Sequence, residues 1–366
     1  MRTLFYISDE TWTGCARTYV AAARGLTERG HSATVACCGS SVVEQRASEA
    51  GLETVPIAAD ANVAADAWWL RRVLQERFVE VAFVHSEREQ FVVGSGMRLA
   101  ERGAVIRRIA PFQPVTSGAT ARLAMRMTAC GLLFSTDADL RNAGATAGMT
   151  LPPAVAPLGV DAAEYDELRP APRRDIGVPG AGLVIACGYD PASRDRMSTV
   201  LRTLALIAPR HADIHLVVYG PGALEDELRL HAAALGVVQF VTFVGPTTDP
   251  LPILRAADVS WVVAQGDHGA YSLLDSMAMR IPVLCERGPL AERYAADGIT
   301  GVCLQPGDPS FTASAVASFL ANGERRTAMG NAGRARVERE FPLAAMLDGF
   351  EKVAGAAGDR SRWAAR

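Results

Sequence analysis

Short apolar segments of strand type alternate with amphipathic segments of helix type along the chain. Residues 4–7 are an apolar run with β character, residues 15–31 carry apolar side chains at helical spacing, and residues 32–38 are apolar again. The first elements therefore follow the order strand, loop, helix, strand. That order is the repeating unit of a parallel sheet with covering helices, so the pattern predicts an α/β protein.

The same alternation begins again in the second half. Residues 168–182 are rich in Pro, Gly and Arg, which favours a linker. The runs at 183–188 and 215–219 beyond it are almost wholly apolar, as strands covered on both faces should be. We predict two Rossmann-like, doubly wound domains that bind ligands at the carboxyl ends of their strands. The expected limits are 1–167 for the N-terminal domain, 168–182 for the linker, 183–343 for the C-terminal domain, and 344–366 for a C-terminal helix and tail.

Composition narrows the class of protein. The chain has 366 residues, 49% of them hydrophobic and 21% charged, which predicts packed cores in two domains. A net charge of −3 gives no basic footprint for nucleic acid. The seven cysteines include no Cys-x-x-Cys pair, and the six histidines show no metal-ligand spacing. Since no secretory leader or membrane-spanning run is recognisable, we expect a cytoplasmic protein with reduced thiols and without a bound metal.

Residues 266–285, GDHGAYSLLDSMAMRIPVLC, place Asp267 and Asp275 eight positions apart. If residues 272–279 form a helix, the loop before it offers backbone amides where the helix dipole favours a phosphate. Gly269 and Ala270 lack bulk and would let a ligand approach closely. Asp275, early in the helix, would bind a ribose diol, and Asp267, in the loop, a sugar hydroxyl. In the alternative interpretation both carboxylates are structural, Asp267 capping a turn and Asp275 stabilising the helix dipole.

A second candidate site is the polar loop after the strand that ends at Gly188. Arg194 and Arg196 in this loop would hold a diphosphate through paired hydrogen bonds, unless they belong to a solvated basic loop. Gly220 ends the next strand and is a weaker signal.

In the first half, Gly14 follows the first strand and His85 stands at another strand end, where it would contact a ligand or serve as a boundary residue. The spacing around Gly14 lacks the three glycines of a dinucleotide site, which argues against a nicotinamide enzyme. The run TARLAMRMTACG places Arg122 and Arg126 on one helical face. It predicts either an ordinary amphipathic surface helix or a peripheral contact with the inner membrane face.

Taken in order, these segments resemble the glycosyltransferases of family 4, which have the two-domain GT-B fold. The likeness spans nearly the whole chain. Its segments are GCARTYVAAARGLTERGH, STDADLRNA, APLGVDAAEY, HLVVYGPG, VTFVGP, LRAADVSWVVA, DHGAYSLLDSMAMRIPVLCE, GITGVCLQPGD and RARVEREFP.

The resemblance implies two domains that face across a cleft, with the C-terminal helix packing back toward the N-terminal domain. Where the family has two donor-site glutamates, this chain has Asp267 and Asp275. Where the family's phosphate loop has an Arg and a Lys, this chain has Tyr189 and Arg194, which leaves Arg196 to supply the second cation.

A further departure concerns Ala110, which occupies a position where many members have a His.

The activity implied is transfer of a sugar, with retention of anomeric configuration, from a UDP- or GDP-sugar to an acceptor hydroxyl of a glycan, lipid-linked or small molecule. No permanently bound cofactor is expected. The alternatives are a catalytically degenerate GT-B binding module and a nucleotide-sugar epimerase. The implied residues are Asp267 and Arg194 for catalysis, Gly188, Tyr189, Arg196, Gly220, Gly269, Ala270, Tyr271, Ser272 and Asp275 for the nucleotide-sugar, and Gly14 and His85 for the acceptor.

Overall fold

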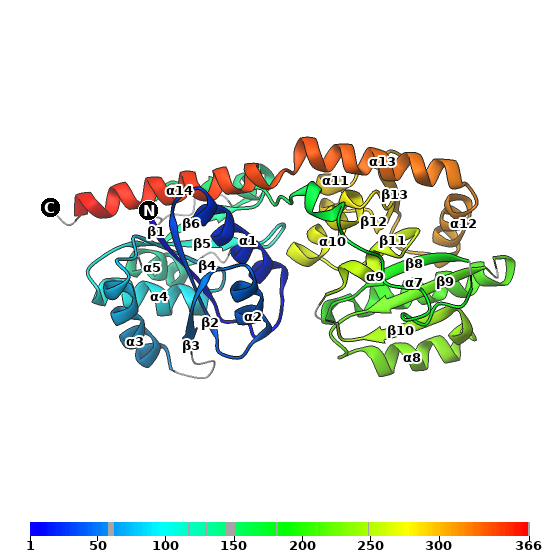
Figure 1. Ribbon diagram of the computed structural model, residues 1–366, viewed down its shortest axis with the longest axis horizontal. Coiled ribbons are helices and arrows are strands. Elements are labelled where there is room, and N and C mark those ends of the chain that lie inside the picture. Colours follow the sequence, from blue (N-terminus) through cyan, green and yellow to red (C-terminus); the bar gives the residue numbers. More distant parts are fainter. Residues whose placement is uncertain are drawn as a thin grey trace. The chain divides into compact units, whose positions relative to one another are not determined.

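The computed structural model of the chain describes residues 1–57, 62–115, 118–128, 130–143, 151–180, 182–211, 213–247 and 249–364. The chain forms two compact units (Figure 1). Unit 1 comprises Met1–Leu158 together with Leu343–Arg366, and unit 2 comprises Gly159–Pro342. Each unit contains one sheet whose paired strands all run parallel, so the prediction of two Rossmann-like α/β domains is confirmed.

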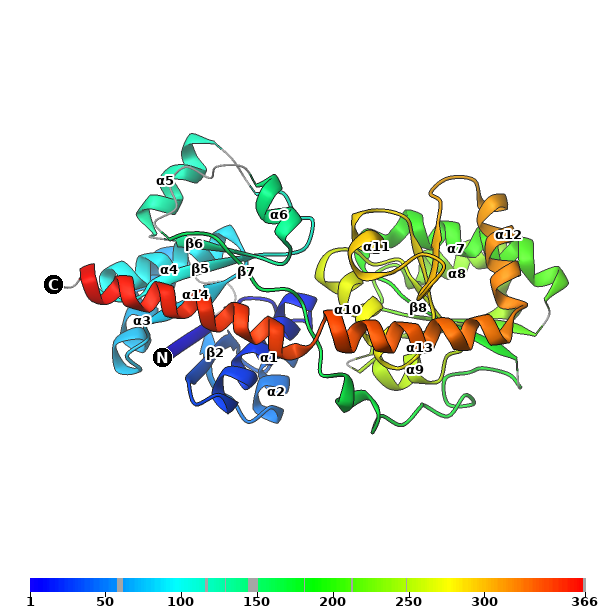
Figure 2. The same ribbon diagram turned by 90° about the horizontal axis from the view of Figure 1, so that it is seen from above.

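In unit 1 the strands lie in the order β3-β2-β1-β4-β5-β6-β7, so the order reverses between β1 and β4. Helices α1, α2 and α14 cover one face, and α3, α4 and α5 cover the other (Figure 2). The strands are β1 Arg2–Ile7, β2 Ser32–Cys38, β3 Glu53–Ile57, β4 Val81–Val84, β5 Ala104–Ile109, β6 Cys130–Phe134 and β7 Ala154–Val155; the helices are α1 Gly14–Glu28, α2 Val42–Glu49, α3 Val63–Glu76, α4 Glu87–Leu99, α5 Ala119–Met127, α6 Asp137–Asn142 and α14 Leu343–Ala364.

The C-terminal helix α14 belongs to the core of unit 1, as predicted. Phe350 is fully buried and lies against the rings of Phe5, Tyr19 and Phe83, with ring centroids 5.1–6.3 Å apart. Gly25 of α1 makes room for this helix, because a Cβ there would lie 2.4 Å from Leu347. Burial of such side chains contributes about 2 kcal/mol each, which holds the end of the chain on the first unit.

In unit 2 the strand order is β10-β9-β8-β11-β12-β13, and it reverses between β8 and β11. Helices α7, α8 and α12 pack on one face, while α10, α11 and α13 lie together on the other (Figure 2). The strands are β8 Leu183–Gly188, β9 Ile214–Tyr219, β10 Val241–Gly245, β11 Val259–Val262, β12 Val283–Glu286 and β13 Gly301–Leu304; the helices are α7 Arg194–Ile207, α8 Glu225–Ala234, α9 Leu251–Arg255, α10 Gly266–Ala278, α11 Pro289–Tyr294, α12 Pro309–Leu320 and α13 Gly323–Glu340; short 3-10 turns are η1 Ala162–Tyr165, η2 Pro191–Ser193, η3 Ala208–Arg210 and η4 Val238–Phe240.

The segment 168–182, which we predicted to be the linker, lies within unit 2 by its contacts. The Arg173 guanidinium donates to the carbonyl of Gly182 at 2.7 Å and to the Asp258 carboxylate at 2.9 Å. Ile176 and Val178 are buried. Composition alone marks this segment as irregular backbone, but its arginine and two apolar side chains fix it to the body of the unit.

Two helices begin earlier than predicted. Helix α7 starts at Arg194, so this arginine opens a helix instead of lying in a loop. Helix α10 starts at Gly266, so Asp267 is in its first turn and Asp275 in its third. The resemblance segment STDADLRNA contains α6 at Asp137–Asn142, and residues 144–150 lie outside the described residues.

None of the described helices is both long enough and apolar enough to cross a bilayer.

Candidate active site

The N-terminus of α10 lies at the carboxyl end of β11, where the candidate acidic pair begins. Gln265 is the N-cap residue with extended backbone, and the Gly269 amide donates to its carbonyl at 3.1 Å. Residues 266–268 are therefore the first three residues of the helix. The prediction that residues 269–271 present the amides is wrong, because the helix begins three residues before them.

The residues after Asp267 serve packing. A Cβ on Gly269 would lie 2.2 Å from the carbonyl oxygen of Ala264, so only glycine lets this helix approach the strand end. Ala270 and Tyr271 are buried, and the Ser272 hydroxyl donates to the carbonyl of His268 at 2.9 Å. Asp267 is itself buried, with 7% of its surface exposed.

Asp275 is buried and receives a hydrogen bond from the hydroxyl of Tyr165, with 2.5 Å between the oxygens. Tyr165 closes the turn η1, and the next residue, Asp166, binds the Arg334 guanidinium through both of its oxygens at 3.1 and 2.8 Å. This paired contact fixes η1 against α13. Tyr165 was not predicted as a site residue, although it ends the APLGVDAAEY segment of the resemblance.

The loop after β8 places its three candidate residues differently from one another. Tyr189 is 2% exposed, its hydroxyl accepts from the Gly222 amide at 3.1 Å, and burial raises its pKa. Arg194 is well exposed and pairs with Glu227 of α8 at 2.8 Å. Arg196 lies one half-turn later on α7 and faces Glu286, with 3.7 Å between Nε and the carboxylate.

Tyr189 is therefore a core residue that organises the strand-end loops, and its side chain does not present a surface to a ligand. Two neighbouring positions must be glycine because aromatic rings pack against them. A Cβ on Gly220 would lie 2.5 Å from the Tyr189 ring, and a Cβ on Gly188 would lie 2.7 Å from the ring of Tyr219.

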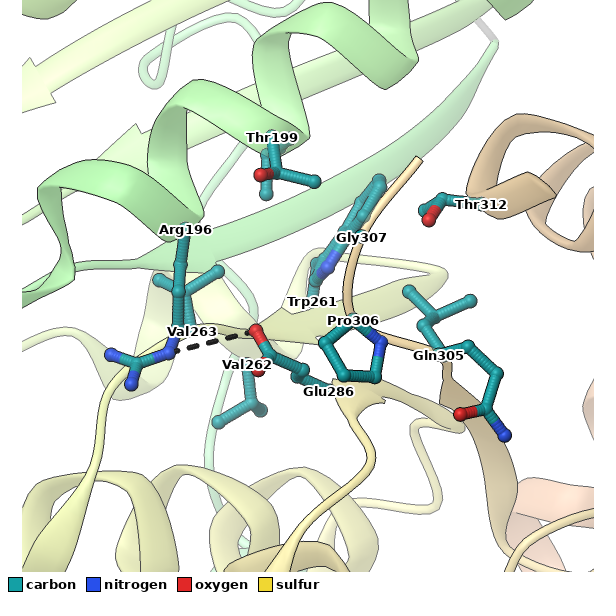
Figure 3. Close-up of a pocket in the computed structure, with 12 residues that line it drawn as sticks. Arg196, Thr199, Trp261, Val262, Val263, Glu286, Gln305, Pro306, Gly307 and Thr312 are labelled. Carbon is teal, nitrogen blue, oxygen red and sulfur yellow. Dashed lines mark ion pairs between the residues drawn. The ribbon is translucent and has the colours of Figure 1, made fainter. Parts of the chain in front are cut away.

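A small hollow of about 50 Å³ opens at the carboxyl ends of β11, β12 and β13 (Figure 3). Arg196 and Glu286 point toward each other at its rim, and Pro306 closes another side (Figure 3). The rest of the lining is mixed polar and apolar: Thr199, Val200, Trp261, Val262, Val263, Leu304, Gln305, Gly307 and Thr312.

The carboxyl edge of the sheet in unit 1 holds a charged cluster around His85, which follows β4. His85 Nδ1 lies 2.7 Å from a Glu89 oxygen at ion-pair distance, though without the geometry of a hydrogen bond, and Nε2 lies 3.4 Å from Asp9. Glu89 is fully buried and also accepts from the Ser8 amide at 2.7 Å and the Ser8 hydroxyl at 2.8 Å. These contacts join the ends of β1 and β4, where the strand order reverses.

The charges in this cluster support one another. Burial alone would lower the pKa of His85, but contacts with Cys15, Asp9 and Glu89 raise it well above its usual range. Burial would raise the pKa of Glu89 and of Asp9, but bonding to His85 lowers both. Imidazolium and carboxylates are therefore the stable forms near neutral pH. Gly14 lies beside this cluster as the first residue of α1, whose N-terminus is capped by Thr13.

Residues 193–336 match the family model described as glycosyl transferases, group 1. The chain is 27% identical over 198 residues to a GDP-mannose-dependent monoacylated alpha-(1-6)-phosphatidylinositol monomannoside mannosyltransferase of Corynebacterium glutamicum, covering 50% of this chain and 51% of that protein. It is 28% identical over 148 residues to the lipopolysaccharide core biosynthesis glycosyltransferase LpsE of Rhizobium meliloti, covering 40% and 44%. The chain thus spans about half the length of these curated relatives, or less.

Solved structures share the fold over nearly the full length. Anabaena HepE in complex with UDP and glucose superposes with a TM-score of 0.79 at 15% identity, covering 97% of this chain and 100% of that one. A glycosyltransferase from Rickettsia africae gives a TM-score of 0.78 at 13% identity, covering 96% and 97%. The match of residues 193–336 and the curated relatives make the chain similar to group 1 glycosyltransferases, and the superposition over nearly the full length shows the GT-B fold.

Proposed function

We propose that the chain transfers a sugar from a UDP- or GDP-sugar to an acceptor hydroxyl with retention of anomeric configuration. The observation that carries the proposal is the hollow at the carboxyl ends of β11, β12 and β13. Its lining residues lie within the matched region 193–336. Relatives named as GDP-mannose-dependent enzymes and a neighbour bound to UDP and glucose support a nucleotide-sugar donor.

The donor would bind to unit 2. Its nucleoside would lie against the rim of the hollow, where Trp261 and Pro306 supply apolar surface. Its diphosphate would contact Arg196, Arg194 and the N-terminal end of α10, whose helix dipole adds to the positive charge where the leaving group becomes anionic. Asp275 would bind the ribose while Tyr165 holds the carboxylate in place. Asp267 would orient the sugar.

The chemistry breaks the bond between the anomeric carbon and the diphosphate oxygen. The acceptor hydroxyl attacks from the face that the diphosphate leaves, and its proton passes to the departing phosphate oxygen. Neutralisation of the diphosphate by guanidinium groups and helix amides is the main contribution of the protein, and removing one such contact costs about 3 kcal/mol in comparable sites. Gly14 and His85 of unit 1 are proposed as acceptor contacts.

The proposal also includes a peripheral contact of unit 1 with a membrane surface. In α5, Leu123 is 58% exposed and Met127 is 49% exposed, and Arg126 lies between them on the surface. The side chain of Arg122, which the same prediction included, lies outside the described residues.

The deciding experiment supplies the purified protein with a panel of UDP- and GDP-sugars and follows donor consumption and products by NMR. We expect slow donor hydrolysis, faster turnover with an acceptor, and a product with the donor's anomeric configuration. An inverted product contradicts retention. An altered free nucleotide-sugar without an acceptor indicates an epimerase, and absence of both nucleotide binding and hydrolysis indicates a degenerate binding module.

A further inference from the structure

Two cysteines lie side by side on neighbouring strands of unit 2. In the parallel pairing of β12 with β13, Cys285 is the register partner of Cys303, and their Sγ atoms are 3.9 Å apart. Neighbouring strands lie about 4.8 Å apart, inside the range of roughly 4.4–6.8 Å between the Cα atoms of disulfide-bonded cysteines. A bond between the two sulfurs therefore requires rotation of side chains and no displacement of strands.

The surroundings of the two thiols differ. Cys285 is buried, while Cys303 is partly exposed and lines a hollow of about 340 Å³ with Arg287, Asp297 and Arg336. A small solute in this hollow can reach Cys303 first. The hydrogen bond between the thiols lowers the pKa of Cys303 and raises that of Cys285, which makes Cys303 the better nucleophile of the pair.

We propose that Cys285 and Cys303 are a modification site that closes to an intrachain disulfide when the protein meets a peroxide. The Cys303 thiolate attacks one peroxide oxygen, so that an S–O bond forms and the O–O bond breaks; the departing hydroxide takes up the proton that the Cys303 thiol released and leaves as water. Cys285 then attacks the sulfenic sulfur, the S–S bond forms, the S–O bond breaks, and the departing hydroxide takes the Cys285 proton. The two thiols together lose two electrons, and one peroxide gains them and becomes two waters.

Four other cysteines are less available for oxidation. Cys37, Cys38, Cys130 and Cys187 are buried, and burial raises the pKa of each thiol. The bond would also join the strands at the residues directly before Glu286 and Leu304, which line the hollow proposed for the donor. The inference itself holds whether or not that hollow binds a nucleotide.

The test treats the folded protein with hydrogen peroxide, alkylates the remaining thiols in denaturant, and maps tryptic peptides by mass spectrometry. Arg287 and Arg293 separate the two cysteines in sequence, so cleavage after arginine places Cys285 in peptide 281–287 and Cys303 in peptide 294–325. We expect these peptides to be recovered joined, with the mass of two hydrogens lost, and to separate on addition of a thiol reductant.

Two variants sharpen the result. With Cys285→Ala, Cys303 should accumulate as a sulfenic acid that a dimedone reagent traps, whereas with Cys130→Ala the joined peptides should form as in the parent. Recovery of both peptides alkylated after peroxide treatment overturns the proposal. A second result also overturns it: if the joined peptides form equally well when the protein is oxidised in denaturant, the pairing does not depend on the strand register.

Discussion

The two units share one architecture but differ in what they place at the reversal of strand order. In unit 1 that edge holds His85 between two carboxylates, with Glu89 fully buried and accepting bonds from the ends of two strands. In unit 2 the corresponding edge is flanked by a hollow whose charged side chains, Arg196 and Glu286, lie at its rim. A parallel sheet supplies a ligand-binding edge in both units. The side chains at the edge in unit 1 form a charge network that stabilises the fold, whereas those at the edge in unit 2 surround a hollow.

The largest effect is expected from Glu89→Gln, which removes a charge that His85 and four backbone or hydroxyl donors share. Breaking such a buried pair should lower the free energy of unfolding of unit 1 by about 3 kcal/mol. Urea unfolding measures the loss, and hydrogen exchange in peptides that contain β1 and β4 locates it.

The control for Glu89→Gln is Glu76→Gln, which removes an exposed i,i+4 partner of Arg72 and should cost less than about 1 kcal/mol. If both variants lose the same amount, the cluster in unit 1 is not a stabilising network.

On the other side of the comparison, Arg196→Gln should lower turnover about 100-fold, or roughly 2.7 kcal/mol, by removing a cation from the leaving diphosphate. Arg202→Gln is the matched control, since Arg202 lies on the same helix and is exposed. The measurement is the steady-state rate of nucleotide-sugar hydrolysis by each variant. Equal rates for the two variants would exclude Arg196 from the site.

A smaller loss is expected when the proposed ribose contact is changed. Asp275→Asn should weaken binding of UDP or GDP about tenfold, or roughly 1.4 kcal/mol. Tyr165→Phe removes the hydroxyl that holds this carboxylate and should weaken binding less, because the acceptor oxygens remain. Calorimetry of nucleotide binding distinguishes the two variants. If Asp275→Asn binds as tightly as the parent, the carboxylate has only its structural role.

Acid should act on unit 1 through the same cluster. The pKa of Glu89 is lowered from 4.5, so its contribution to stability is present above 4.5 and is lost as the pH falls through its value in the folded state. The raised pKa of His85 acts in the other direction, since its contribution is present below 6.5 and is lost only as the pH rises through the folded value. Between about pH 7 and pH 3, the free energy of unfolding should change less with pH in Glu89→Gln than in the parent.

The smallest effect concerns the surface of unit 1. The double change Leu123→Ser and Met127→Ser should reduce sedimentation with vesicles of anionic phospholipid a few-fold, because it removes exposed apolar side chains beside Arg126. Leu230→Ser on α8 of unit 2 is the control, since Leu230 is 73% exposed, and it should change nothing. Binding that is unaffected by the double change would remove α5 from any membrane contact.

Much of the architecture could be predicted from the sequence because buried parallel strands require nearly continuous apolar runs. The runs at residues 183–188 and 215–219 are β8 and most of β9. Helix starts were harder to predict. Residues 266–271 contain two glycines and a histidine, which favour a loop locally, yet the close approach of Gly269 to Ala264 makes them the first turns of α10. The site was predicted in outline only, since Asp275 was identified but its partner Tyr165, 110 residues away, was not.

By itself the sequence determined two parallel α/β units, a C-terminal helix that belongs to the first, and the residue types available at the strand ends. Those features follow from local periodicity and from the apolar content of each segment. Only the tertiary structure decided that Tyr189 is a core residue, that Arg196 and Glu286 face each other, and that Cys285 lies beside Cys303. Each of these depends on which strands become neighbours and in which register. Strand pairing and register are determined by contacts between positions far apart in the chain, so they cannot be predicted from any single segment.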